Sequence, residues 1–140
     1  MISITEYLER HFDGTDALWR EAFPNDAPWN AAHISIAEKL RFQPNLLLVA
    51  IQADRVVGSI MAGYDGHRGW ISRISVLQSH RRKGIGEALI HEAETRLAGL
   101  GCVKINLQVV VSNSAVLGFY RKCGYEVEER VSMSKLLPKC

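Results

Sequence analysis

The chain has little of what marks a secreted, membrane-bound or metal-binding protein. Its three cysteines, Cys102, Cys123 and Cys140, are odd in number and widely spaced, which predicts neither a disulfide framework nor a zinc site. The longest apolar run, residues 46–51, is far too short to span a bilayer. The first residues lack the basic and apolar regions of a signal peptide. We therefore expect a cytoplasmic protein with no metal and no membrane partner.

The sequence also lacks a linker, a low-complexity tract and an internal repeat, so we expect one domain over residues 1–140. Hydrophobic residues make up 47% of the chain, which is ample for one core. The formal net charge is only +2, and the cations are scattered apart from Arg81, Arg82 and Lys83. A nucleic-acid partner is not expected, because it would need a basic stripe or face.

What stands out is a basic turn, residues 81–87, between two regular segments. Residues 70–77 are β-branched and aromatic, which predicts a strand, and apolar residues at helical spacing predict a helix over 85–100. A strand that runs through a glycine-containing turn into a helix exposes unpaired backbone N–H groups at the positive end of the helix dipole. With three cations beside Gly84 and Gly86, the turn predicts a site for a phosphate or pyrophosphate.

The spacing of this turn excludes two common phosphate motifs. It lacks the length and the Lys-Ser/Thr ending of a P-loop, and no third glycine completes a dinucleotide fingerprint. Taken alone, the turn could equally be a solvated basic loop.

Two further sequence motifs favour a phosphate site over a solvated loop. Asn113 is followed seven residues later by Tyr120, and residues 119–125 read Phe-Tyr-Arg-Lys-Cys-Gly-Tyr. Together with residues 74–76 and the basic turn, in this order and spacing, they make the chain resemble the GCN5-related N-acetyltransferase (GNAT) superfamily. The Gly-Tyr-Asp-Gly-His-Arg-Gly segment at 63–69 and Pro-Trp-Asn at 28–30 further resemble a small bacterial branch with poorly defined substrates.

The pattern and the resemblance together predict an α+β fold with a mixed central sheet of about six to seven strands and about four helices. Each helix is expected to begin and end at a recognisable signal, with caps at Asp13, Asn30 and residues 112–114 and a C-cap at Gly124. The resemblance implies that the two central strands splay apart at the acyl-CoA site. The strands are expected at residues 2–7, 46–53, 56–64, 70–77, 102–109, 125–129 and 131–136, with a hairpin turn at Asp54 and Arg55.

The resemblance also implies how acetyl-CoA is held as co-substrate. The amides of residues 82–87 would bind the pyrophosphate, and the main chain of residues 74–76 would pair with the pantetheine arm. Asn113, which could also serve as a plain helix N-cap, would contact that arm. The residues expected to bind the co-substrate are Ile74, Ser75, Val76, Arg81, Arg82, Lys83, Gly84, Ile85, Gly86, Glu87, Asn113 and Tyr120.

Tyr120 resembles the general acid of the family, because a tyrosine with a pKa near 10 can protonate a leaving thiolate. An aromatic core position would explain its spacing as well. The general base is open, since Gln108 stands where one branch of the family has a glutamate. His67 and Asp65 are candidates, although Asp65 and Gly66 would make a hairpin turn without any catalytic role. Trp29, Gln108 and Arg73 are the candidate acceptor-binding residues, and Trp19 is expected in the core.

These observations predict an N-acetyltransferase that moves an acetyl group from acetyl-CoA to a primary amine by direct attack in a ternary complex. The acceptor would be a small metabolite or a protein amine, and the protein could form a homodimer. The alternative is an acyl-CoA sensor without turnover, which the lack of an obvious base would favour.

Overall fold

The computed structural model describes residues 1–138, which fall into two compact units that meet after Gln108. The expectation of a single domain stays a prediction. None of the helices among the described residues has the length and apolar character needed to cross a membrane.

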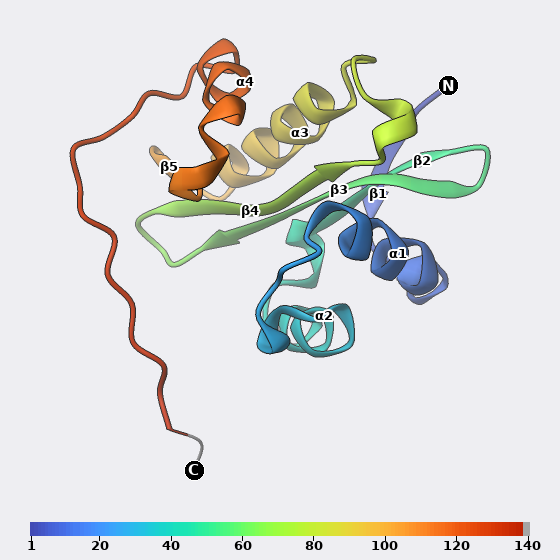
Figure 1. Cartoon of the computed structure of the whole chain (residues 1–140), viewed down its shortest axis with the longest axis horizontal. Coiled ribbons are helices and arrows are strands. Elements are labelled where there is room, and N and C mark those ends of the chain that lie inside the picture. The colour runs from blue at the N-terminus through green and yellow to red at the C-terminus, as the bar shows by residue number, and fades with distance from the viewer. Residues whose placement is uncertain (139–140) are drawn as a thin grey trace. The chain divides into compact units, whose positions relative to one another are not determined.

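The first unit is built on a five-stranded sheet in the order β1-β2-β3-β4-β5 (Figure 1). Neighbouring strands are antiparallel except β4 and β5, which are parallel. The sheet is therefore mixed, as the sequence predicts. The strands are β1 (Ser3–Glu6), β2 (Leu47–Gln52), β3 (Arg55–Tyr64), β4 (Gly69–Val76) and β5 (Ile105–Leu107).

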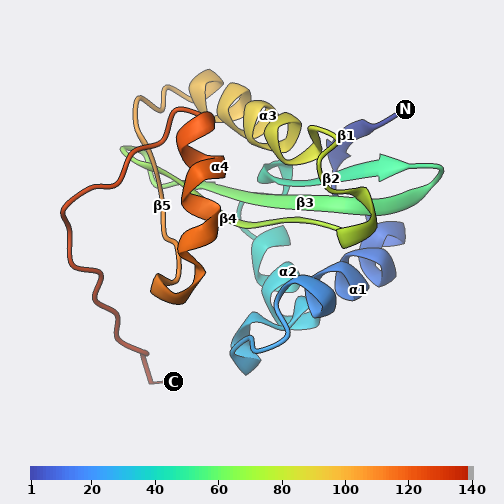
Figure 2. The same ribbon diagram turned by 45° about the horizontal axis from the view of Figure 1, so that its top comes forward.

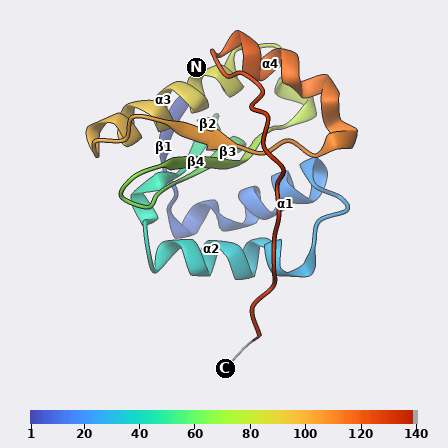
Figure 3. The ribbon, with the colours of Figure 1, turned by 90° about the vertical axis from the view of Figure 1, so that its left-hand side faces the viewer.

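Helices cover both faces of this sheet. The helices α1 (Phe12–Ala22) and α2 (Ala32–Leu40) lie on one face, and α3 (Ile85–Gly99) lies on the other (Figures 1 and 3). The buried residues of α3 include Ile85, Leu89, Ala93 and Leu97, which recur every four residues and so form one apolar stripe. The helix predicted from this spacing is confirmed.

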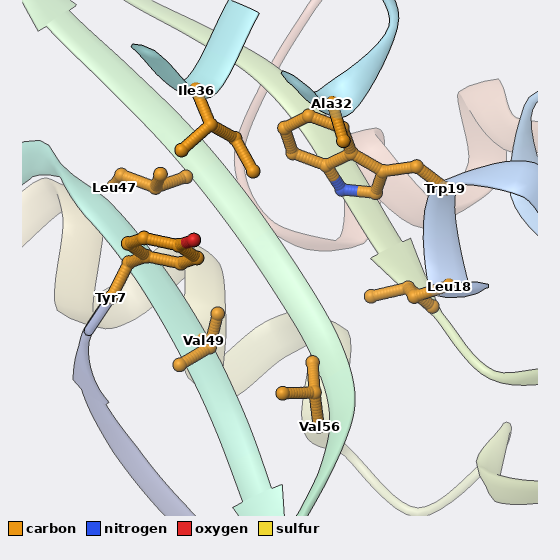
Figure 4. Close-up of a cluster of buried hydrophobic side chains, with 8 residues drawn as sticks. All are labelled: Tyr7, Leu18, Trp19, Ala32, Ile36, Leu47, Val49 and Val56. Carbon is orange, nitrogen blue, oxygen red and sulfur yellow. The ribbon is translucent and has the colours of Figure 1, made fainter. Parts of the chain in front are cut away.

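One core fills the space between the sheet and the first two helices (Figure 4). Trp19 is 4% exposed within it, which confirms its expected place in the core. Each large apolar side chain buried here contributes about 1.5–3 kcal/mol to stability. The buried cluster consists of Tyr7, Leu18, Trp19, Ala32, Ile36, Leu47, Val49 and Val56.

The second unit contains a 3-10 helix, Val111–Val116, followed by α4 (Leu117–Lys122). Gly124 ends α4 with φ +95°, and its amide bonds the Arg121 carbonyl while the Tyr125 amide reaches the Tyr120 carbonyl. This pair of hydrogen bonds is a Schellman motif, in which glycine is preferred because its φ is positive. The C-cap of α4 is Cys123, one residue before the predicted Gly124, which is instead the positive-φ residue of the motif.

The two strands expected at residues 125–129 and 131–136 are wrong, so the described chain has five strands instead of six to seven. These residues do alternate between apolar and polar side chains. A strand, however, also needs a partner backbone to complete its ladder, and alternation alone does not supply one. Most of these side chains are exposed in the described structure.

The predicted positions of one hairpin turn and one helix cap each differ from the structure by one residue. The β2–β3 hairpin turns at Ala53 and Asp54, which have φ of +50° and +61°, instead of at Asp54 and Arg55. Two consecutive positive φ values form the turn whose twist matches the flanking strands. Helix α2 has Ala31 as its N-cap, so the expected cap at Asn30 is wrong.

Candidate functional site

The parallel strands β4 and β5 separate halfway along β4. Only Gly69, Trp70 and Ile71 of β4 pair with β5, whereas β4 continues to Val76 beside β3 (Figure 2). Among the described residues, no strand pairs with the other edge of β4 from Ser72 onward. The main chain of residues 72–76 is therefore an open strand edge, as the predicted splay requires.

A β-bulge lies where the two strands part. Ser59 and Met61 of β3 pair with Ser75 and Ser72 of β4, so β4 has one extra residue in this interval. Arg73 lies within it with φ +54°, a left-handed conformation that costs energy for a residue with a side chain. Bulges re-aim a strand and interrupt its pairing, which accounts for the open edge that follows.

A buried hydroxyl network supports this bulge from β3. The Ser59 hydroxyl donates to the Arg73 carbonyl at 2.8 Å and accepts from Trp19 Nε1 at 2.8 Å. The Ser75 hydroxyl lies 2.9 Å from the Ser59 hydroxyl oxygen and can donate to it, since that oxygen has two lone pairs. Sequence analysis missed Ser59, although a serine inside the apolar run of β3 is the one available signal.

The strand β4 leads through a 3-10 turn, Gln78–His80, into the basic turn. Arg82 and Gly84 have φ of +64° and +78°, and α3 begins at Ile85. No hydrogen bond to another described residue uses the amides of residues 82–86. Arg81, Arg82 and Lys83 are exposed. The turn therefore combines unpaired amides, a helix N-terminus and cations, which together suit a pyrophosphate.

The packing of α3 against β3 requires a glycine at position 58, which sequence analysis also missed. A Cβ on Gly58 of β3 would lie 3.0 Å from Leu89 Cδ1 and 3.1 Å from the Ser75 carbonyl oxygen. Helix α3 can therefore approach the sheet closely at its first turns, where Ile85 is buried. By contrast, a Cβ on Gly84 would meet nothing within 4 Å, so that position is open toward solvent.

Tyr120 lies half-buried on α4, in the second unit. Its ring meets Phe119 edge to face with centroids 5.2 Å apart, and Tyr125 at 6.4 Å. Burial raises the pKa of Tyr120 above its ordinary value of 10.0, and Cys123 adds to this shift. The phenol is therefore protonated at neutral pH, as a general acid must be.

Asn113 lies inside the 3-10 helix with non-helical φ and ψ of −107° and 40°. Its side chain caps neither that helix nor α4, whose N-cap is Val116. The expected caps at residues 112–114 are therefore wrong, because the 3-10 turn places these residues before α4 begins. Asn113 therefore does not serve as a helix N-cap, and its side chain is exposed.

The β3–β4 hairpin holds the two candidate bases at the end of β4 that is remote from the basic turn. Asp65 Oδ1 accepts from the amides of His67 at 2.8 Å and Arg68 at 2.7 Å. These bonds, that of Arg68 foremost, lower the pKa of Asp65. His67 Nε2 accepts from Arg68 Nη1 at 2.7 Å. This geometry shows the turn function of Asp65, while a role as base stays a prediction for either residue.

The candidate acceptor residues lie in separate places. Trp29 is 52% exposed in a 3-10 turn, Pro28–Asn30, between α1 and α2. Gln108 follows β5 and is exposed. The Arg73 side chain contacts the rings of Trp19 and Phe23 and pairs with the Asp26 carboxylate. It therefore lies on the α1 side of the sheet.

The sequence profile of the acetyltransferase (GNAT) family matches residues 9–125 of the chain. An acetyltransferase of Sodalis glossinidius is 47% identical over 104 residues, covering 74% of this chain and 73% of that protein. An acetyltransferase of Yersinia enterocolitica is 41% identical over 136 residues, covering 97% and 96%. Among solved structures, an aminoglycoside N-acetyltransferase in complex with CoA superposes with a TM-score of 0.78, at 20% identity, over 97% of this chain and 95% of that one.

Proposed function

The chain belongs to the acetyltransferase (GNAT) family, and from this premise we propose that it acetylates a primary amine by direct attack within a ternary complex. Family membership makes it an acyltransferase with acetyl-CoA as co-substrate. This chain's own residues would hold the donor, receive the amine and move protons.

One observation carries the donor site: the open edge of β4 is followed, after the 3-10 turn Gln78–His80, by the basic turn. A pantetheine arm contains amides, so it can pair with the main chain of residues 74–76 as an added strand does. The pyrophosphate would then reach the amides of residues 82–87 at the start of α3. Arg81, Arg82 and Lys83 would add charge attraction there.

Direct transfer requires a neutral amine to attack the thioester carbonyl carbon. A C–N bond forms, the C–S bond breaks, and the thiolate of CoA takes a proton. Tyr120 would supply that proton, and its raised pKa keeps the phenol protonated until it is needed. The amine would lose its proton to water or to an acceptor-side group, for which His67 stays a candidate.

The acceptor would approach from the side of α1 and α2, where Trp29 offers an exposed aromatic surface. The solved neighbour acts on aminoglycosides by its name, but a likeness at 20% identity shows the fold alone. No group of three or more His, Cys, Asp or Glu side chains gathers within the described residues as a metal site would require. We propose that the acceptor is a small-molecule amine or a peptide amine.

Calorimetric titration with acetyl-CoA, CoA and ATP tests the donor site first. We expect micromolar binding of acetyl-CoA and none of ATP, and then release of free thiol in a screen of amines. The variant Gly86→Glu places a carboxylate against the pyrophosphate and should abolish acetyl-CoA binding. Gly99→Glu adds the same charge at the other end of α3, where a Cβ meets nothing within 4 Å, and serves as control. Equal binding by both variants would remove the basic turn from the donor site.

A further inference from the structure

Arg73 is the residue in which the bulge of β4 and the acceptor side of the molecule meet. Its side chain is only 11% exposed. The guanidinium carbon lies 5.0 Å from the ring centroid of Trp19 and 4.5 Å from that of Phe23. Stacking of a cation on two aromatic rings away from water is favourable and fixes the plane of the guanidinium.

The same guanidinium closes a ring of hydrogen bonds with the connector between α1 and α2, residues 23–31. Arg73 Nη2 donates to the Asp26 carboxylate and, at 2.8 Å, to the Asn30 carbonyl oxygen. Asn30 Nδ2 in turn donates to the other Asp26 oxygen at 3.2 Å. Both carboxylate oxygens of Asp26 therefore accept hydrogen bonds, and Trp29 lies in the sequence between the two bonded residues, Asp26 and Asn30.

The backbone of Arg73 is tied just as firmly on the other side. The Ser59 hydroxyl holds its carbonyl oxygen, and its φ of +54° defines the bulge at the open edge of β4. A ligand that adds to this edge restrains the same stretch of backbone from which the guanidinium extends. Within the described residues, the main-chain hydrogen bonds of the connector are local turns, such as the bond from the Asp26 amide to the Phe23 carbonyl oxygen.

We propose that Arg73 is a positioning residue that couples the connector to the open edge of β4, so that binding of acetyl-CoA orders the acceptor side before the amine arrives. The proposal rests on the proposed function, because it takes acetyl-CoA to bind along β4. Arginine is required and lysine does not suffice, since only a planar guanidinium can stack on both rings while it bonds two acceptors.

Hydrogen exchange of the peptide covering residues 23–31, with and without saturating acetyl-CoA, tests this coupling without knowledge of the acceptor. In the wild-type protein we expect acetyl-CoA to slow exchange by about tenfold, within the ordinary range of coupling between two sites. The slowing should disappear in Arg73→Lys and in Asp26→Ala, which removes both acceptor oxygens. The second variant keeps Arg73 in place, so it answers the question if Arg73→Lys does not fold.

Arg20→Met is the matched control. It deletes a guanidinium–carboxylate pair on α1, Arg20 with Asp16, whose arginine is 79% exposed and does not reach the connector. This variant should keep the full slowing. If calorimetry shows acetyl-CoA binding while the wild-type connector exchanges unchanged, or if Asp26→Ala keeps the slowing, the coupling is refuted and the proposed function stands. If the wild-type protein does not bind acetyl-CoA at all, the proposed function and the coupling both fail.

Discussion

Ser59 has no exposed surface, and its hydroxyl is the central atom of the network beneath the bulge. In Ser59→Ala, the Trp19 indole N–H and the Arg73 carbonyl oxygen both lose the partner that they have at 2.8 Å. A buried polar group left without a partner costs about 1–3 kcal/mol. We therefore expect the free energy of unfolding to fall by about 2–4 kcal/mol, and Tm to fall by roughly 10 °C.

Urea unfolding followed by tryptophan fluorescence measures this loss, since all three tryptophans lie in the first unit. Ser72→Ala removes an exposed serine of β4 and should change stability by less than about 0.5 kcal/mol. The double variant Trp19→Phe with Ser59→Ala should cost less than the sum of the single variants, because the unpaired N–H leaves with its partner. A loss below about 1 kcal/mol for Ser59→Ala, with additive effects in the cycle, would refute the reasoning.

Three further outcomes follow from the described contacts. Gly58→Ala should destabilise the fold by about 1–3 kcal/mol and weaken acetyl-CoA binding, because its Cβ would press on the Ser75 carbonyl under α3; unchanged calorimetric affinity would contradict this. Burial, and to a lesser extent the charge of Arg10, lowers the pKa of His11 below 6.5. The unfolded chain therefore binds more protons than the folded one as the pH drops through about 6.5, and the stability of the fold should decrease there. His11→Asn should show a smaller loss of Tm between about pH 8 and about pH 5, and an identical loss would exclude His11 as the source. Tyr120→Phe should lower turnover by about 10²-fold or more while the Kd for acetyl-CoA stays constant, and a collapse of donor affinity would make Tyr120 structural.

Much of the fold could be predicted because its signals are local. The four-residue spacing along α3 and the positive φ that a Schellman motif requires at Gly124 are properties of short segments. The basic turn could be predicted for the same reason, since cations, glycine and the start of a helix are adjacent in the sequence. In each case the pattern and the structure agree within a few residues.

The remainder depends on which strand finds a partner, and no local pattern records this. Residues 125–136 alternate as a strand would, yet they form none in the described structure. The left-handed φ of Arg73 is equally invisible, because bulges carry no fixed residue type when the first position is not glycine. Ser59 and Gly58 could have been noticed as breaks in an apolar strand, but their partners come from three other segments of the chain.

The contacts of Ser59 and Arg73 hold the bulge that lies beside the open edge of β4. A strand edge inside a sheet exposes unpaired N–H and C=O groups and attracts any extended segment. Here the bulge is held from the side opposite to the opening, by the Ser59 hydroxyl on β3 and by the guanidinium of Arg73 against α1 and the connector. Those contacts leave the edge itself free to pair with an added strand. Substitutions at Ser59 or Arg73 should therefore change the geometry of the edge without removing a single atom that faces it, which separates them from changes in the basic turn.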